Sequence, residues 1–124
     1  MTNPRIARLL VFTLLLGACI GGRKSRSSRT DPVMIQVQNN NWADVVVYAV
    51  SGSQTMRIGD VTTGKIGRFR APADVDPTIR DFRIRIDPIG PRGSFLTQLI
   101  SVGPGQTIYV TVENDLNLTN YVVR

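Results

Sequence analysis

The chain has 124 residues, of which 15 are Lys or Arg, nine are Asp or Glu, one is Cys and none is His. Without histidine it lacks the usual general base near neutral pH and the most common metal ligand, and a single thiol cannot by itself form a zinc site. The composition therefore predicts a protein that is not an enzyme and that holds no metal or other cofactor.

The net charge of +6 belongs to the N-terminal part of the chain. Six basic residues precede Thr30 with no acidic residue among them: Arg5, Arg8, Arg23, Lys24, Arg26 and Arg29. From Thr30 onward, nine basic residues are balanced by nine acidic ones. Because a basic segment lies close to anionic lipid head groups, the charge predicts a membrane surface as the partner and not a nucleic acid.

Residues 1–18 have the layout of a secretory signal. Arg5 and Arg8 form a charged region, the apolar run Leu9–Leu16 follows, and the small residues Gly17 and Ala18 come next. The run is too short for a transmembrane helix, which needs about 20 apolar residues. We therefore expect residues 1–18 to be a signal peptide that is removed.

The four residues Leu16, Gly17, Ala18 and Cys19 resemble the lipobox of bacterial lipoproteins. The resemblance implies that the Cys19 sulfur receives a diacylglyceryl group and that acyl chains such as palmitate anchor the protein in a membrane. An ordinary secretory signal is the alternative, but it prefers a small residue where Leu16 stands. Ile20 is not the aspartate that holds many lipoproteins at the inner membrane, so the resemblance favours an outer membrane where two membranes exist.

Residues 19–32 carry the lipid attachment site and a segment of glycine, serine and basic residues. Such a segment buries too little apolar surface to offset the entropy of ordering it. We expect a disordered basic tether that holds residues 33–124 away from the bilayer as one domain.

Apolar residues repeat with a period of two along the predicted domain, which indicates strands. The candidate strands are residues 35–38, 44–50, 56–61, 66–70, 81–87, 95–102, 108–112 and 120–124, with a loop at 72–77. About seven or eight short strands separated by turn residues predict an all-β fold, a small antiparallel β-sandwich of the immunoglobulin-like kind. A small closed β-barrel is the alternative, favoured if the terminal strands pair with each other.

Two loops rich in Asn and Asp follow similar strands, at residues 39–44 and 114–117. If both lie at one end of the sandwich, their oxygen atoms could share a calcium ion. Turn formation is the stronger interpretation, because Asn and Asp tolerate left-handed backbone geometry and hydrogen-bond their own backbone.

Two candidate binding features remain. Arg68 and Arg70 share one face of a predicted strand, and Arg83 and Arg85 share a face of another. If these strands are neighbours, the four guanidinium groups form a ladder that could bind phosphate or carboxylate groups. An ordinary solvated face paired with Asp60, Asp81 and Asp87 is the alternative. Trp42, the only tryptophan, either covers one end of the core or is an exposed aromatic contact.

Together these features predict a membrane-anchored lipoprotein of the cell envelope. Its β-sandwich would serve as a non-catalytic protein-interaction or structural module, with an envelope protein as partner. The alternative function is binding of anionic envelope glycan or lipid head groups through the arginine-rich sheet face.

Overall fold

The computed structural model describes residues 31–73 and 81–124. The strands are β1 (Met34–Asn39), β2 (Val45–Ser51), β3 (Gln54–Val61), β4 (Ile66–Arg70), β5 (Phe82–Pro88), β6 (Phe95–Leu96), β7 (Thr107–Val112) and β8 (Asn120–Val123), with a short 3-10 turn, η1 (Leu116–Leu118), before β8. The predicted signal peptide, the lipobox and nearly all of the tether lie outside the described residues.

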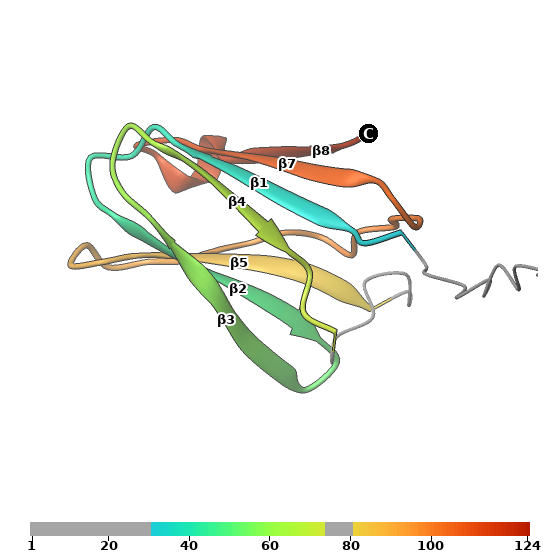
Figure 1. The fold of residues 1–124 in the computed structure, drawn as a ribbon. Coiled ribbons are helices and arrows are strands. Elements are labelled where there is room, and N and C mark those ends of the chain that lie inside the picture. The colour runs from blue at the N-terminus through green and yellow to red at the C-terminus, as the bar shows by residue number, and fades with distance from the viewer. Residues whose placement is uncertain (1–30, 74–80) are drawn as a thin grey trace, which may run out of the picture.

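Two four-stranded sheets pack face to face (Figure 1). Sheet A has the strand order β4-β1-β7-β8 and sheet B the order β3-β2-β5-β6. This confirms the predicted all-β sandwich with seven or eight strands. Within residues 31–73 and 81–124 the sheets do not close into the alternative barrel, because β7 lies between the terminal strands β1 and β8.

One strand pair differs from the purely antiparallel prediction. β1 and β7 run parallel, with Ile35 opposite Ile108 and Val37 opposite Val110. Parallel neighbours require a long crossover connection, and the strands of sheet B form much of the chain between β1 and β7. Such long-range pairing cannot be read from the local alternation of residues.

The core lies between the sheets and consists of the inward residues of each strand. Side chains alternate between the two faces of a strand, so that every second residue of β1, β2, β5 and β7 is buried. The buried apolar residues are Val33, Ile35, Val37, Val45, Val47, Ala49, Val61, Phe82, Ile84, Ile86, Ile100, Val102, Ile108, Val110 and Val112. Most of them are β-branched, which suits the pleated surface of a strand.

Two glycines allow Phe69 to pack at the edge where β3 and β4 meet. A Cβ atom at Gly59 would lie 2.5 Å from Cε1 of Phe69, and one at Gly67 would lie 2.5 Å from Cγ2 of Val61. Any other residue would therefore displace the ring. The pairing of β2 with β3 shifts register near Gly59, between Val47 and Tyr48.

The strand predicted at residues 95–102 is regular only at Phe95–Leu96. Beyond it the chain still follows β5, because the amide of Thr97 donates to the carbonyl oxygen of Ile84 and the amide of Ile100 donates to that of Phe82. The amide of Ile84 donates to the Thr97 hydroxyl at 2.9 Å instead of to a backbone carbonyl oxygen. This side-chain bond interrupts the backbone ladder, so the predicted strand was too long.

Candidate interaction sites

The sandwich has two distinct ends. β1, β3, β5 and β7 all end at the distal end, which we define by the loops 40–44, 62–65, 89–94 and 113–119. β1 begins at the opposite, proximal end, which carries the turns 52–53 and 103–106. There the amide of Gly105 donates to the carbonyl oxygen of Asp31 at 2.9 Å.

Asn39 organises the first distal loop from inside the protein. Its side chain is fully buried, and Nδ2 donates to the carbonyl oxygens of Ala43 and Val61, both at 2.9 Å. Its Oδ1 accepts the amide of Asn41 at 2.9 Å. A buried amide must satisfy its hydrogen-bonding groups, and these three bonds fix the loop against the end of β3.

Asn41 joins this loop to the loop after β7. Its Nδ2 donates to the carbonyl oxygens of Glu113 and Asn114, at 2.9 and 3.3 Å, and its Oδ1 accepts the amide of Ala43. The amide of Trp42 donates to Oδ1 of Asn114 at 2.9 Å. The backbone on both sides of Trp42 is therefore held by direct hydrogen bonds.

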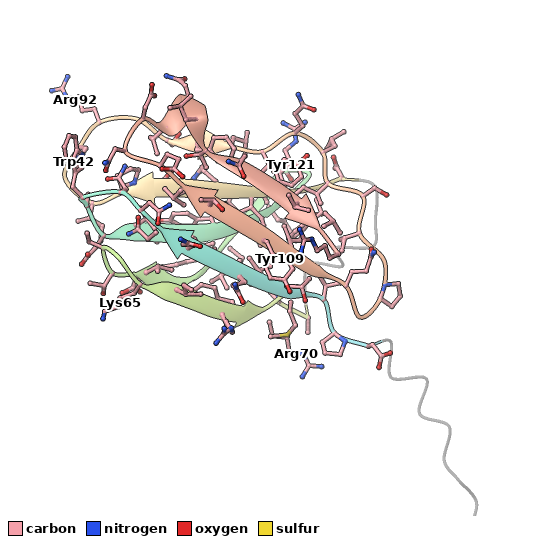
Figure 2. The ribbon with its side chains drawn as sticks, turned by 90° about the horizontal axis from the view of Figure 1, so that it is seen from above. Trp42, Lys65, Arg70, Arg92, Tyr109 and Tyr121 are labelled. Carbon is pink, nitrogen blue, oxygen red and sulfur yellow. The ribbon has the colours of Figure 1, made fainter. Side chains whose placement is uncertain are left out.

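The Trp42 side chain does not cover the core, because 77% of its surface is exposed. Of the two interpretations from the sequence, the structure shows the exposed aromatic residue. Figure 2 shows Trp42 at the distal end, with Lys65 and Arg92 at the same end and Arg70 toward the other. Two more apolar side chains are exposed on distal loops, Ile89 at 56% and Leu118 at 65%.

The Asn- and Asp-rich loops do meet at one end, but as hydrogen-bonded turns. The side-chain oxygens of Asn39 and Asn41 accept backbone amides of their own loop. Asp44 accepts the amide of Thr63, and Asp115 accepts the amide of Asn117. In residues 31–73 and 81–124, no three acidic or cysteine side chains cluster as metal ligands would. The turn interpretation is confirmed.

The four predicted arginines do not form one ladder. Arg68 and Arg70 lie on β4 at the edge of sheet A, whereas Arg83 and Arg85 lie on β5 inside sheet B. The condition for a shared face is not met, because β4 pairs with β1 whereas β5 pairs with β2 and β6. The two arginine pairs belong to opposite outer faces of the sandwich.

On sheet B, one of the ion pairs of the solvated-face alternative is present, between Arg85 and Asp87. Nε of Arg85 lies 3.2 Å from Oδ2 of Asp87, and its guanidinium carbon lies 4.3 Å from the centre of the Tyr48 ring. Arg57 forms a 3.0 Å bond with Asp60 on the same sheet. Arg85 is therefore engaged by an anion and by an aromatic face.

On sheet A, Arg68 belongs to a group of residues that sequence reasoning missed. Its Nε donates to Oε1 of Gln36 at 2.9 Å. Together with Tyr109 these two residues line a shallow hollow of about 230 Å³. The alternation of each strand predicts that all three face outward, but only the pairing of β4, β1 and β7 brings them together.

No helical segment in the part of the chain that the structure describes is long and apolar enough to cross a membrane. Leu16, Gly17, Ala18 and Cys19 lie outside that part, so the lipobox stays a prediction.

Comparisons with known proteins give neither a family nor a function. No protein-family model matches the chain, and no curated protein matches it. A protein from Eubacterium rectale with an NMR structure is similar over 76% of this chain and 87% of its own, with 7% sequence identity and a TM-score of 0.46.

Proposed function

We propose that this protein is a lipid-anchored lipoprotein of the cell envelope, and that its β-sandwich is a non-catalytic module that binds a partner protein through the distal end. Cys19 is the attachment point, and the outer membrane is the location in a cell with two membranes. The lipobox residues Leu16–Cys19 support the anchor. The geometry of the described domain supports the docking role.

The main support for this role is that Trp42 and the start of β1 lie at opposite ends of the sandwich. The chain enters the sandwich at the proximal end, and Trp42 lies at the distal end, beyond the full length of β1. The 12 residues from Cys19 to Thr30 can span at most about 40 Å. Because the anchor would join the proximal end, Trp42 is free to face away from the bilayer.

An exposed tryptophan on a fixed backbone suits a protein partner. Tryptophan is enriched among the residues that contribute most to binding energy at protein interfaces. The bonds from Asn41 and from the Trp42 amide order the loop before any partner arrives, which lowers the entropy lost on binding. The side chains of Ile89 and Leu118 are also exposed, on other loops of the distal end.

Photocrosslinking in cells tests this function. A photoreactive amino acid replaces Trp42 in the full chain, and the matched control carries it at Ser53, which is exposed at the proximal end. We expect one defined protein adduct from position 42 and none of the same mass from position 53. Equal adducts from both positions, or only glycan or lipid adducts from position 42, would contradict a docking role for the distal end.

A further inference from the structure

The outward face of sheet A is built from side chains in three rows across the four strands. One row holds Arg68, Gln36, Tyr109 and Val122, and the next holds Arg70, Met34 and Thr107. The third row holds Ile66, Gln38, Thr111 and Asn120. Residues directly opposite on paired strands point to the same side of a sheet, so these residues share the outward side of sheet A, which we call the sheet A face. Figure 2 labels Arg70 and Tyr109 on it.

The sheet A face carries positive charge without a carboxylate side chain in any of its three rows. Two acidic side chains, Glu113 and Asp31, lie just beyond the ends of these rows. At the distal end, Glu113 accepts a hydrogen bond from Nδ2 of Asn40. At the proximal end, Asp31 lies against Gly105. On sheet B, by contrast, Arg57 and Arg85 each have an aspartate beside them.

The hollow on this face combines three kinds of contact. It is lined by Met34, Ile35, Gln36, Arg68, Thr107 and Tyr109. The bond between Arg68 and Gln36 holds the guanidinium at its rim, and Tyr109 is 38% exposed. A guanidinium binds carboxylate and phosphate groups, an aromatic ring offers an apolar surface with a polar tip, and the amide and hydroxyl groups exchange hydrogen bonds with alcohols.

We propose that the sheet A face binds an acidic polysaccharide. Arg68 and Arg70 are two residues apart on one strand, so their Cα atoms are separated by about 7 Å along β4, and they would contact successive acidic groups of the polymer. Tyr109 would pack against a sugar ring in the hollow, while Gln36 and Thr107 bind its hydroxyl groups. A hollow that is open to solvent on a broad sheet face suits an extended polymer better than a small molecule, which usually binds in an enclosed pocket.

This site is independent of Cys19 and of Trp42, so it can be tested without the anchor or the distal end. The full chain with Cys19→Ser stays free of lipid, and its affinity for polygalacturonate is measured at low salt. The basic tether contributes the same background to every variant. The test variant is Arg68→Gln with Arg70→Gln, and the matched control, Lys65→Gln with Arg92→Gln, removes two charges at the distal end instead.

We expect Arg68→Gln/Arg70→Gln to weaken binding tenfold or more and the control pair to weaken it less than twofold. Equal losses of affinity in the two double variants would show that binding depends only on net charge, and would contradict a specific site on the sheet A face. Circular dichroism melting curves establish that each variant is folded. Because Arg68 and Arg70 are exposed, we expect these variants to melt with the parent protein.

Two further measurements identify the ligand class. Tyr109→Thr keeps the charge and should weaken binding to polygalacturonate several-fold while leaving binding to inorganic polyphosphate, which has no sugar ring, unchanged. Equal effects on both polymers would overturn the polysaccharide assignment.

Binding to vesicles of phosphatidylglycerol tests whether the ligand is a lipid. We expect Arg68→Gln/Arg70→Gln to bind these vesicles as the parent does. A tenfold loss of vesicle binding would instead assign the face to lipid head groups.

Discussion

Nδ2 of Asn41 lies 2.9 Å from the backbone carbonyl oxygen of Glu113, across 72 positions of sequence. This bond connects the loop after β1 with the loop after β7, and Trp42 stands on the connected segment. Because β1 and β7 are parallel neighbours, their last residues lie side by side at the distal end, and a short side chain suffices to join the two loops.

Asn39 should contribute far more to stability than its neighbour Asn40. Asn39→Ala removes three bonds and leaves the partly buried carbonyl of Ala43 and the buried carbonyl of Val61 without the Nδ2 donor. Unpaired buried groups cost about 1–3 kcal/mol each, so we expect the free energy of unfolding to fall by about 3 kcal/mol. Urea denaturation measures it. Asn40→Ala, at an exposed position, should change it by less than about 1 kcal/mol; equal losses would show that the buried network is not what matters.

Gly67 should not tolerate a methyl group. A Cβ there would lie 2.5 Å from Cγ2 of Val61 and 2.9 Å from the Phe69 ring, and overpacking of this kind costs about 1–3 kcal/mol. We expect Gly67→Ala to lower the thermal melting temperature. The control is Gly103→Ala, whose new atom would lie 3.4 Å from the end of the flexible Gln106 side chain. A melting temperature of Gly67→Ala equal to that of the parent would contradict the packing described for Phe69.

Trp42 should behave as a solvent-exposed side chain in the folded protein. Since it is the only tryptophan and is 77% exposed, acrylamide should quench its fluorescence nearly as well in the native as in the unfolded state. Trp42→Ala should change the free energy of unfolding by less than about 0.5 kcal/mol. Strong protection from acrylamide in the isolated protein would restore the interpretation of Trp42 as a cover for the core.

Tyr48 and Arg85 should be energetically coupled. The guanidinium carbon lies 4.3 Å from the ring centre, and the Arg85 side chain is only 34% exposed. A double-mutant cycle with Tyr48→Leu and Arg85→Gln should give a coupling of about 1 kcal/mol. Arg57 is the control: it lies opposite Tyr48 on the other neighbouring strand and pairs with Asp60. Its coupling to Tyr48 should be within error of zero, and equal couplings would reject a specific contact.

Local pattern was enough to predict most strands and the layered architecture. The alternation in Phe82, Ile84 and Ile86 predicts an inward face, and these residues are buried. Strand order was not predictable, because it depends on pairing between distant segments. The sequence therefore leaves open a shared face for Arg68 and Arg83, which lie on different sheets, and does not predict the contact between Arg68 and Gln36.

The local sequence pattern also does not predict which side chains are exposed at the distal end. Asn39, Asn40 and Asn41 are alike in sequence, but Asn39 is buried at the end of β1 and Asn41 is buried against the loop after β7, whereas Asn40 is exposed. The same bonds hold the Trp42 backbone in place and leave its side chain in solvent. A turn was predictable here from composition, whereas the direction of the tryptophan was not.

Mass spectrometry of the N-terminal peptide tests the lipid anchor most directly. The protein is produced with its native leader in a bacterium that processes lipoproteins. We predict that the mature chain begins at Cys19, with a diacylglyceryl group on the sulfur, and that Cys19→Ser abolishes both the mass increase and recovery with the membrane fraction. An exported chain with an unmodified Cys19 thiol would contradict the anchor, and with it the orientation proposed for the distal end.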